Sequence, residues 1–224
     1  GVDLNFGCPA PTVNKSKGGA VLLKEPETIY RIVKAVREAV PAHLPVSAKI
    51  RLGYDDKELY LENAQAVFQG GANELAVHAR TKREGYKAPA HWEYVDAIRR
   101  ALPIPVTANG EIWDHQDALA CASVSGCDAL MVGRGAISLP NLANVMKTGC
   151  PHMSWAEVLQ LMVSYTEQDL ASEKADYYPS RIKQWFSYLK REYPEADLLF
   201  QEIRVLKETD PIRDALLQAA KSHG

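Results

Sequence analysis

Short apolar runs alternate with amphipathic stretches over the first two thirds of the chain. Five of the runs are rich in β-branched or small apolar residues, which predicts buried strands at 1–5, 45–52, 74–80, 104–110 and 127–135. Between them, apolar residues recur every three or four positions and predict helices at 27–40, 58–71 and 114–126. Consecutive strand–helix units of this kind predict a parallel sheet and the α/β class.

Five strands leave two architectures open. One is a complete five-stranded doubly wound sheet. The other is the last five strands of a (β/α)8 TIM barrel, a fold with eight strands and about 250 residues. Because the chain begins inside a predicted strand, "GVDLN", and without Met, we expect that an N-terminal piece is missing from this sequence.

The pattern changes near residue 150. Strand signals end, and proline-punctuated amphipathic segments predict helices at 154–170, 179–193, 194–208 and 210–224. Ser154 and Glu157 form a capping-box pattern at the start of the first of them. We therefore predict two domains, an α/β domain at 1–150 and an all-α helical bundle at 151–224.

Composition narrows the classes of function. The chain has 224 residues and a net charge of −2, so it lacks the overall basic charge of a nucleic-acid-binding domain, and any such binding needs a local patch. No apolar run reaches the about 18 residues that a membrane-spanning helix requires. Cys8, Cys121, Cys127 and Cys150 form no C-x-x-C pair, which argues against a zinc site and favours free thiols in a reducing cytosol.

Polar residues and glycines stand at the carboxyl ends of the predicted strands, where the sites of barrels gather. They include Asn5, Cys8, Lys49, Arg51, His78, Arg80, Asn109, Gly110, Glu111, Gly133, Arg134 and Gly135. The glycines of "ANG" and "VGRG" allow close backbone approach to an anion, which favours a phosphate at the last two loops. Lys49 interrupts an apolar strand, so it faces either an anionic ligand or a carboxylate. His78 is either a ligand-contacting residue or a buried structural histidine.

Cys8 stands between Gly7 and Pro9, just past the first predicted strand. With His78 as its base it would be the nucleophile of a Cys–His hydrolase. As a protonated thiol it would be a proton donor, and as a small buried side chain it would have no chemical role. The residues alone leave these three roles open.

Several motifs resemble those of one enzyme family. "LNFGCPAPTVNKSKGGAVLL" resembles the signature of the tRNA-dihydrouridine synthases, N-x-G-C-P followed by a glycine-rich loop. "KIRLGY", "VHARTKREGY", "ANGEIW" and "GCDALMVGRGA" follow in the family's order and spacing, and "RIKQWFSYLKREY" is similar to the bacterial subfamily that modifies position 16 of tRNA. The resemblance covers essentially the whole chain, and the first three strands of the family's barrel have no counterpart in it.

The resemblance implies an FMN-binding TIM barrel, with its last five strands present here, followed by a helical tRNA-recognition domain. It also implies a cytoplasmic oxidoreductase that acts on tRNA, with no DNA or membrane partner, and that is a monomer at full length. In the implied reaction NADPH reduces FMN, a hydride passes from flavin N5 to uracil C6, and Cys8 delivers a proton to C5.

The resemblance also implies roles for other residues of this sequence. The positions that match the FMN contacts of the family are Lys49, His78, Asn109, Gly110, Glu111, Gly133 and Arg134. The positions that match its tRNA contacts are Asn5, Tyr86, Arg181, Lys183, Tyr188 and Arg204. No metal site is expected.

Two alternatives stay open beside the tRNA reductase. The first is an FMN-barrel reductase of a free pyrimidine, against which the appended helices and their Arg and Lys residues argue. The second is a non-catalytic tRNA-binding module, which would bind RNA without Cys8 and without flavin.

Overall fold

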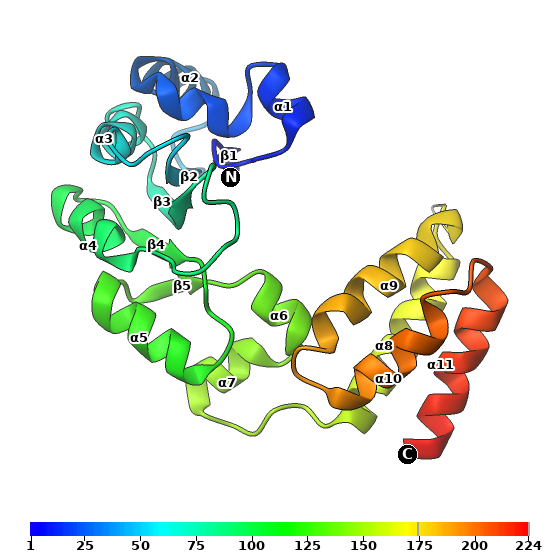
Figure 1. Cartoon of the computed structure of the whole chain (residues 1–224). Coiled ribbons are helices and arrows are strands. Elements are labelled where there is room, and N and C mark those ends of the chain that lie inside the picture. Colours follow the sequence, from blue (N-terminus) through cyan, green and yellow to red (C-terminus); the bar gives the residue numbers. More distant parts are fainter. Residues whose placement is uncertain (174, 224) are drawn as a thin grey trace. The chain divides into compact units, whose positions relative to one another are not determined.

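A computed structural model of the chain describes residues 1–173 and 175–223 (Figure 1). Its contacts divide it into two compact units. The first comprises Gly1–Ile112 and Gln116–Val132, and the second comprises Trp113–His115 and Gly133–Gly224. The contacts thus place the segment 133–150 with the helical unit. The division at residue 150 into a catalytic and a tRNA-recognition domain stays a prediction.

The first unit contains a five-stranded, wholly parallel sheet. Its strands are β1 (Val2–Asn5), β2 (Val46–Gly53), β3 (Glu74–Thr81), β4 (Val106–Asn109) and β5 (Ala129–Met131). They are hydrogen-bonded in the sequential order β1-β2-β3-β4-β5. A doubly wound sheet reverses its strand order at a switch point. This sheet has no reversal, so the doubly wound alternative is wrong and the order is that of a (β/α) barrel.

Helices α2 (Pro26–Ala39), α3 (Tyr60–Gln69), α4 (Trp92–Ala101) and α5 (His115–Ser125) lie on the same side of this sheet (Figure 1). The short α1 (Pro11–Lys15) and the 3-10 helix η1 (Gly19–Lys24) connect β1 to α2. Fully buried apolar side chains, among them Ile29, Val33, Val67, Val77 and Ile98, form the core between helices and strands. Burying a side chain of this size contributes about 1.5–3 kcal/mol, so this layer holds the sheet in place.

The last predicted strand is shorter than the sequence pattern indicated. Only Ala129–Met131 pairs as β5, and α6 (Arg134–Ser138) begins directly after Gly133. The N–H of Ala136 donates to the carbonyl of Gly133 at 3.0 Å, a local hydrogen bond that replaces sheet pairing. The apolar run at 127–135 therefore contains the strand β5 and the start of the helix α6, because the backbone after residue 133 forms local helical hydrogen bonds.

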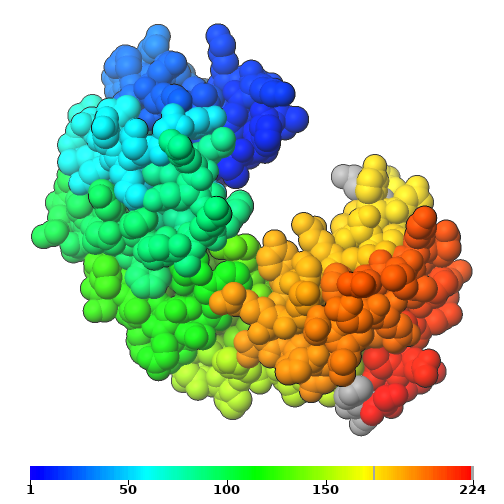
Figure 2. Space-filling model, in the orientation of Figure 1, coloured from blue at the N-terminus to red at the C-terminus, as the bar shows by residue number. Residues whose placement is uncertain are grey.

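In the part of the second unit that is described, the regular elements are all helices. It contains α6, α7 (Leu142–Thr148), α8 (Trp155–Leu170), η2 (Ala175–Tyr177), α9 (Tyr178–Leu189), α10 (Pro194–Ile203) and α11 (Thr209–His223). The four predicted helices are confirmed as α8, α9, α10 and α11, although α10 ends at Ile203. Gly224, the predicted end of the last helix, lies outside the described residues. Figure 2 shows α10, in orange, packed beside α11, in red.

The capping box and an aromatic cluster stabilise this unit. The N–H of Ser154 donates to Oε2 of Glu157 at 2.7 Å, and the N–H of Glu157 donates to Oγ of Ser154 at 3.3 Å. The ring of Trp155 lies 6.4 Å from that of Phe186 and 5.7 Å from that of Tyr193, centroid to centroid. Among the helices described, none has the length and apolar character needed to span a membrane.

Candidate active site

Cys8 lies in the loop between β1 and α1, and hydrogen bonds fix the backbone of this loop. Oδ1 of Asn5 accepts from the N–H of Gly7 at 2.9 Å, and Nδ2 of Asn14 donates to the Cys8 carbonyl at 2.9 Å. Gly19 has a φ of +63°, and a Cβ atom at this position would lie 2.7 Å from the same carbonyl oxygen. The asparagines and the glycine therefore form one support for Cys8, whose side chain is half-buried.

The registers of the parallel strands align three polar residues. Arg51 pairs with His78, and His78 pairs with Asn109, so the three lie in one row near the carboxyl ends of β2, β3 and β4. Lys49 precedes Arg51 by two residues and therefore shares its face of the sheet. Nζ of Lys49 donates to Oδ1 of Asn109 at 3.0 Å, and Nδ2 of Asn109 donates to the carbonyl of Met131 at 2.7 Å. These contacts join β2, β4 and β5 at one end of the sheet.

Lys49 is a half-buried cation. Burial and the nearby charge of Arg51 lower its pKa to about 8, against a smaller opposite effect of Asp3. Within the described residues Lys49 forms no ion pair with a carboxylate, and its ammonium group donates to the amide oxygen of Asn109. The carboxylate alternative for Lys49 is therefore not favoured, and its charge suits an anionic ligand.

His78 is buried, and its imidazole lies against the backbone of Gly110. Gly110 has a φ of +120°, and a Cβ atom here would lie 3.0 Å from Cδ2 of His78. The indole N–H of Trp92 donates to the Gly110 carbonyl at 2.9 Å. Nη1 of Arg80 lies 3.4 Å from Nε2 of His78. Only glycine fits this position without strain, which explains the Gly after Asn109 in the "ANG" motif.

Glu111 pairs with a fully buried cation. A terminal nitrogen of the Arg80 guanidinium donates to Oε2 of Glu111, and Nε of Arg80 donates to the carbonyl of Pro89 at 3.1 Å. The Arg80 side chain has no exposed surface. Glu111 thus has an observed structural role, and its predicted contact with a cofactor stays a prediction.

Arg51 joins the Cys8 loop to the segment that follows β3. The side chain is 2 % exposed, and its Nε donates to the carbonyl of Gly7 at 3.0 Å. Its Nη1 donates to the carbonyls of Thr81 at 3.1 Å and Gly85 at 2.9 Å. Sequence reasoning placed Arg51 at a strand end without giving it a role, although a charge in the apolar run "KIRL" was a signal.

Tyr86 stands in the segment that Arg51 and Glu84 hold. It is 52 % exposed, and its ring lies 5.2 Å from the guanidinium carbon of Arg51 and 6.0 Å from the His78 ring. Glu84 accepts hydrogen bonds from Nζ of Lys57 and from the backbone N–H of Thr81. Burial raises the pKa of Glu84, but these bonds outweigh it and bring the pKa down to about 2.

The remaining predicted residues belong to the second unit. The guanidinium of Arg134 lies over the ring of Trp113, 4.9 Å from the centroid, and Gly133 precedes it at the start of α6. Arg181 donates to Oδ2 of Asp169 at 2.7 Å, and Nζ of Lys183 donates to the carbonyl of Leu206. These two predicted tRNA contacts therefore have partners within the unit.

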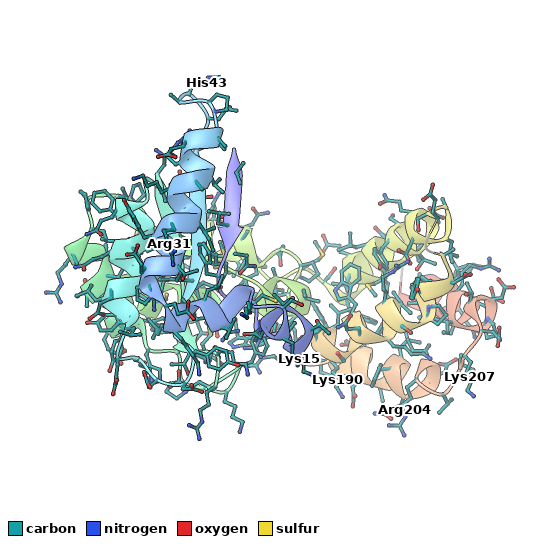
Figure 3. All side chains as sticks on the ribbon, turned by 90° about the horizontal axis from the view of Figure 1, so that it is seen from above. Lys15, Arg31, His43, Lys190, Arg204 and Lys207 are labelled. Carbon is teal, nitrogen blue, oxygen red and sulfur yellow. The ribbon has the colours of Figure 1, made fainter. Side chains whose placement is uncertain are left out.

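Arg204 and Tyr188 differ from that pair. Arg204 is exposed and forms no hydrogen bond or ion pair with its side chain among the described residues. Figure 3 shows it at the same edge of the second unit as Lys190 and Lys207. Tyr188 is half-buried and lines a surface cavity of the same unit.

The first unit thus brings together most of the residues predicted for the reaction. Asn5, Cys8, Lys49, His78, Tyr86, Asn109, Gly110 and Glu111 lie on β1–β4 or on the segments that follow these strands. Sequence reasoning missed the supporting roles of Asn14, Arg51, Arg80 and Glu84, because no local pattern indicates which group each of these side chains meets. The described part of the chain contains no cluster of three or more His, Cys, Asp or Glu residues able to hold a metal ion.

Comparisons with known proteins agree with the motifs. The family model described as dihydrouridine synthase matches residues 1–222. The tRNA-dihydrouridine(16) synthase of Shewanella oneidensis is 63 % identical over 219 residues, covering 98 % of this chain and 70 % of that protein. The proteins of the same name from Vibrio cholerae and Escherichia coli K12 are each 55 % identical over 217 residues, which is 96 % of this chain and 67 % and 69 % of theirs.

Proposed function

Because this chain belongs to the dihydrouridine synthase family, we propose that it reduces a uridine of tRNA to 5,6-dihydrouridine. Position 16 is the proposed target, since all three relatives compared above carry that position in their names. The observation that carries the proposal is the fixed Cys8 loop, tied through Arg51 to the row that also contains His78 and Asn109. At full length the enzyme would work as a monomer in the cytoplasm, where its substrate is found.

The residues at the carboxyl ends of the strands fit FMN. Lys49 offers a half-buried ammonium group without a carboxylate partner in the described chain, which suits the electron-rich pyrimidine edge of a flavin. His78, Asn109, Gly110 and Glu111 would hold the ring system together with Lys49, and Gly133 and Arg134 would hold the phosphate. When bound, and after reduction by NADPH, FMN supplies the hydride for C6 of uracil.

Cys8 is the proposed proton donor to C5 of uracil. A general acid must present its proton within hydrogen-bond reach of the atom that receives it. The bonds from Asn14 to the Cys8 carbonyl and from Gly7 to Asn5 hold the backbone of the loop, so the point from which the thiol extends is set before substrate arrives. The side chain is half-buried, which leaves the resulting thiolate a route to regain a proton from water.

The tRNA contacts are proposed for both units. A uridine must leave its stack to reach an enzyme site, and an exposed aromatic ring such as that of Tyr86 suits an unstacked base. Asn5 is the last residue of β1 and accepts a hydrogen bond from Gly7, in the loop that carries Cys8. Arg181, Lys183, Tyr188 and Arg204 are the proposed contacts of the helical unit with the tRNA backbone.

The test is a reaction of the chain with FMN, NADPH and unmodified tRNA, in which mass spectrometry of the digested RNA measures dihydrouridine. We expect Cys8→Ala to abolish the product while flavin and tRNA stay bound. Cys150→Ala is the matched control, because Cys150 is a half-buried free thiol as well and is expected to leave turnover unchanged.

Three results would contradict parts of the proposal. Normal turnover of Cys8→Ala would remove the acid role of Cys8. Turnover of free uracil or orotate without RNA would favour the pyrimidine reductase. Binding of tRNA by a chain that retains no flavin, and that is unaffected by Cys8→Ala, would favour the non-catalytic module.

A further inference from the structure

A cavity of about 400 Å³ opens on the surface of the second unit. Its walls come from the segment before α5 and from α6, α9, α10 and the turn between the last two. The residues that matter for its chemistry are Trp113, Ser138, Tyr188, Lys190, Arg191 and Asp197. The volume is large enough for one nucleotide, since small-molecule sites span about 300–1,000 Å³.

Arg191 provides an unpaired positive charge in this cavity. Its guanidinium carbon lies 3.9 Å from the centroid of the Trp113 ring, a stacked arrangement that fixes the planar group. The guanidinium forms no hydrogen bond or ion pair among the described residues, so its N–H donors are available. Lys190 adds a second cation, which Asp197 neutralises in part at 3.6 Å.

Ser138 provides the second, independent indication of a ligand. It is 3 % exposed, and its Oγ is a buried atom without a hydrogen-bond partner in the described chain. A buried hydroxyl without a partner is costly and rare in native proteins. Because Ser138 lines the cavity, an acceptor oxygen bound there would satisfy it.

We propose that this cavity binds one nucleotide of the tRNA substrate, with its phosphate between Arg191 and Ser138 and its base or ribose against Tyr188. The inference rests on the proposed function, since it takes tRNA as the substrate. A polymer suits the site better than a free nucleotide, because the exposed cations Arg204 and Lys207 continue the positive charge from Lys190 along the same edge of the unit (Figure 3). A guanidinium stacked on an aromatic ring is also a platform for nucleobases.

The experiment compares Ser138→Ala, Arg191→Glu and Lys147→Glu in binding to unmodified tRNA by fluorescence anisotropy at several salt concentrations. Lys147 is exposed on α7 of the same unit, lies outside the cavity and is the charge-matched control. We expect Arg191→Glu to weaken binding about tenfold or more and to reduce the salt slope by about one unit. We expect Ser138→Ala to weaken binding about fivefold with no loss of thermal stability, because its hydroxyl has no partner in the free protein.

Three outcomes of the tRNA titrations would overturn the inference. These are equal losses for Arg191→Glu and Lys147→Glu, an unchanged affinity of Ser138→Ala, and the absence of tRNA binding by the wild-type chain. A parallel titration with adenosine monophosphate tests whether the cavity binds the phosphate of a free nucleotide rather than that of tRNA. Ser138-dependent binding of the mononucleotide, with tRNA affinity independent of Ser138, would also overturn it. A lack of dihydrouridine in the presence of Ser138-dependent tRNA binding would instead reject the proposed function and leave this site standing.

Discussion

Nε of Arg51 donates a hydrogen bond to the carbonyl oxygen of Gly7 at 3.0 Å, one residue before Cys8. The same guanidinium donates from Nη1 to Gly85, one residue before Tyr86. A single buried side chain therefore holds both the proposed proton donor and the proposed base-contacting aromatic residue. This relationship makes the position of Cys8 depend on a residue that need not touch the substrate.

Arg51→Lys is expected to lower the rate of dihydrouridine formation at saturating tRNA by about tenfold or more, because an ammonium group cannot reach all three carbonyls. The free energy of unfolding should fall by about 2–4 kcal/mol, since buried carbonyls lose their donors. Denaturant unfolding and single-turnover kinetics measure the two effects.

Arg37→Lys is the matched control for Arg51→Lys. Arg37 also donates to three carbonyls, those of Val40, Pro41 and Leu44, but it does so before the amino end of β2. It should lower stability without changing the rate. Equal rates for the two variants would show that Arg51 does not position the Cys8 loop.

Lys49 predicts a pH dependence of flavin binding. With a pKa of about 8 in the free protein, its ammonium is charged below pH 8 and becomes neutral above it. An anionic ligand raises this pKa on binding, so FMN affinity should fall by up to about tenfold per pH unit between pH 8 and the pKa in the complex. Flavin fluorescence titrations from pH 6.5 to 9.5 measure the slope. Lys49→Met should bind weakly at all these pH values, and a slope that persists in this variant would assign the titration to another group.

Glu111→Gln should destabilise the first unit, whatever its effect on cofactor binding. Arg80 is fully buried, and removing the charge of its partner leaves an uncompensated cation. We expect a loss of about 2–4 kcal/mol in the free energy of unfolding. Glu93→Gln is the control, because the Glu93 side chain pairs with His91 but is 61 % exposed. This variant should lose at most about 0.5 kcal/mol in the free energy of unfolding. Denaturant melts of both variants at pH 7 compare them, and equal losses would contradict the structural role of Glu111.

Arg181 and Arg204 are expected to respond differently to charge reversal. Arg204→Glu should weaken tRNA binding about fivefold or more and leave the melting temperature unchanged, because Arg204 is exposed and has no polar partner among the described residues. Arg181→Glu should also lower the melting temperature, since the new carboxylate faces the nearly buried Asp169. Thermal melts and tRNA titrations of both variants provide the comparison. A stable Arg181→Glu variant with weakened binding would show that the ion pair is dispensable.

The fold class and the residues proposed for the reaction could be predicted from local sequence. Apolar runs and helical stripes placed all five strands and the helices α8–α11 of the second unit, because a strand buried on both faces and a helix buried on one face each leave a characteristic spacing of apolar residues. The Gly–Cys–Pro motif and the polar strand ends indicated where chemistry gathers, since parallel strands bring their carboxyl ends to one side.

Tertiary structure decided the partners of these residues. The strand order that excludes a doubly wound sheet, and the row of Arg51, His78 and Asn109, depend on register between strands whose paired residues lie 22 or more positions apart. The pairing of Glu111 with Arg80, and of Arg181 with Asp169, likewise depends on which side chains meet in space. Local composition determines whether a segment is buried and which chemistry it carries. Which buried group meets which is set by long-range packing, and no local pattern records that.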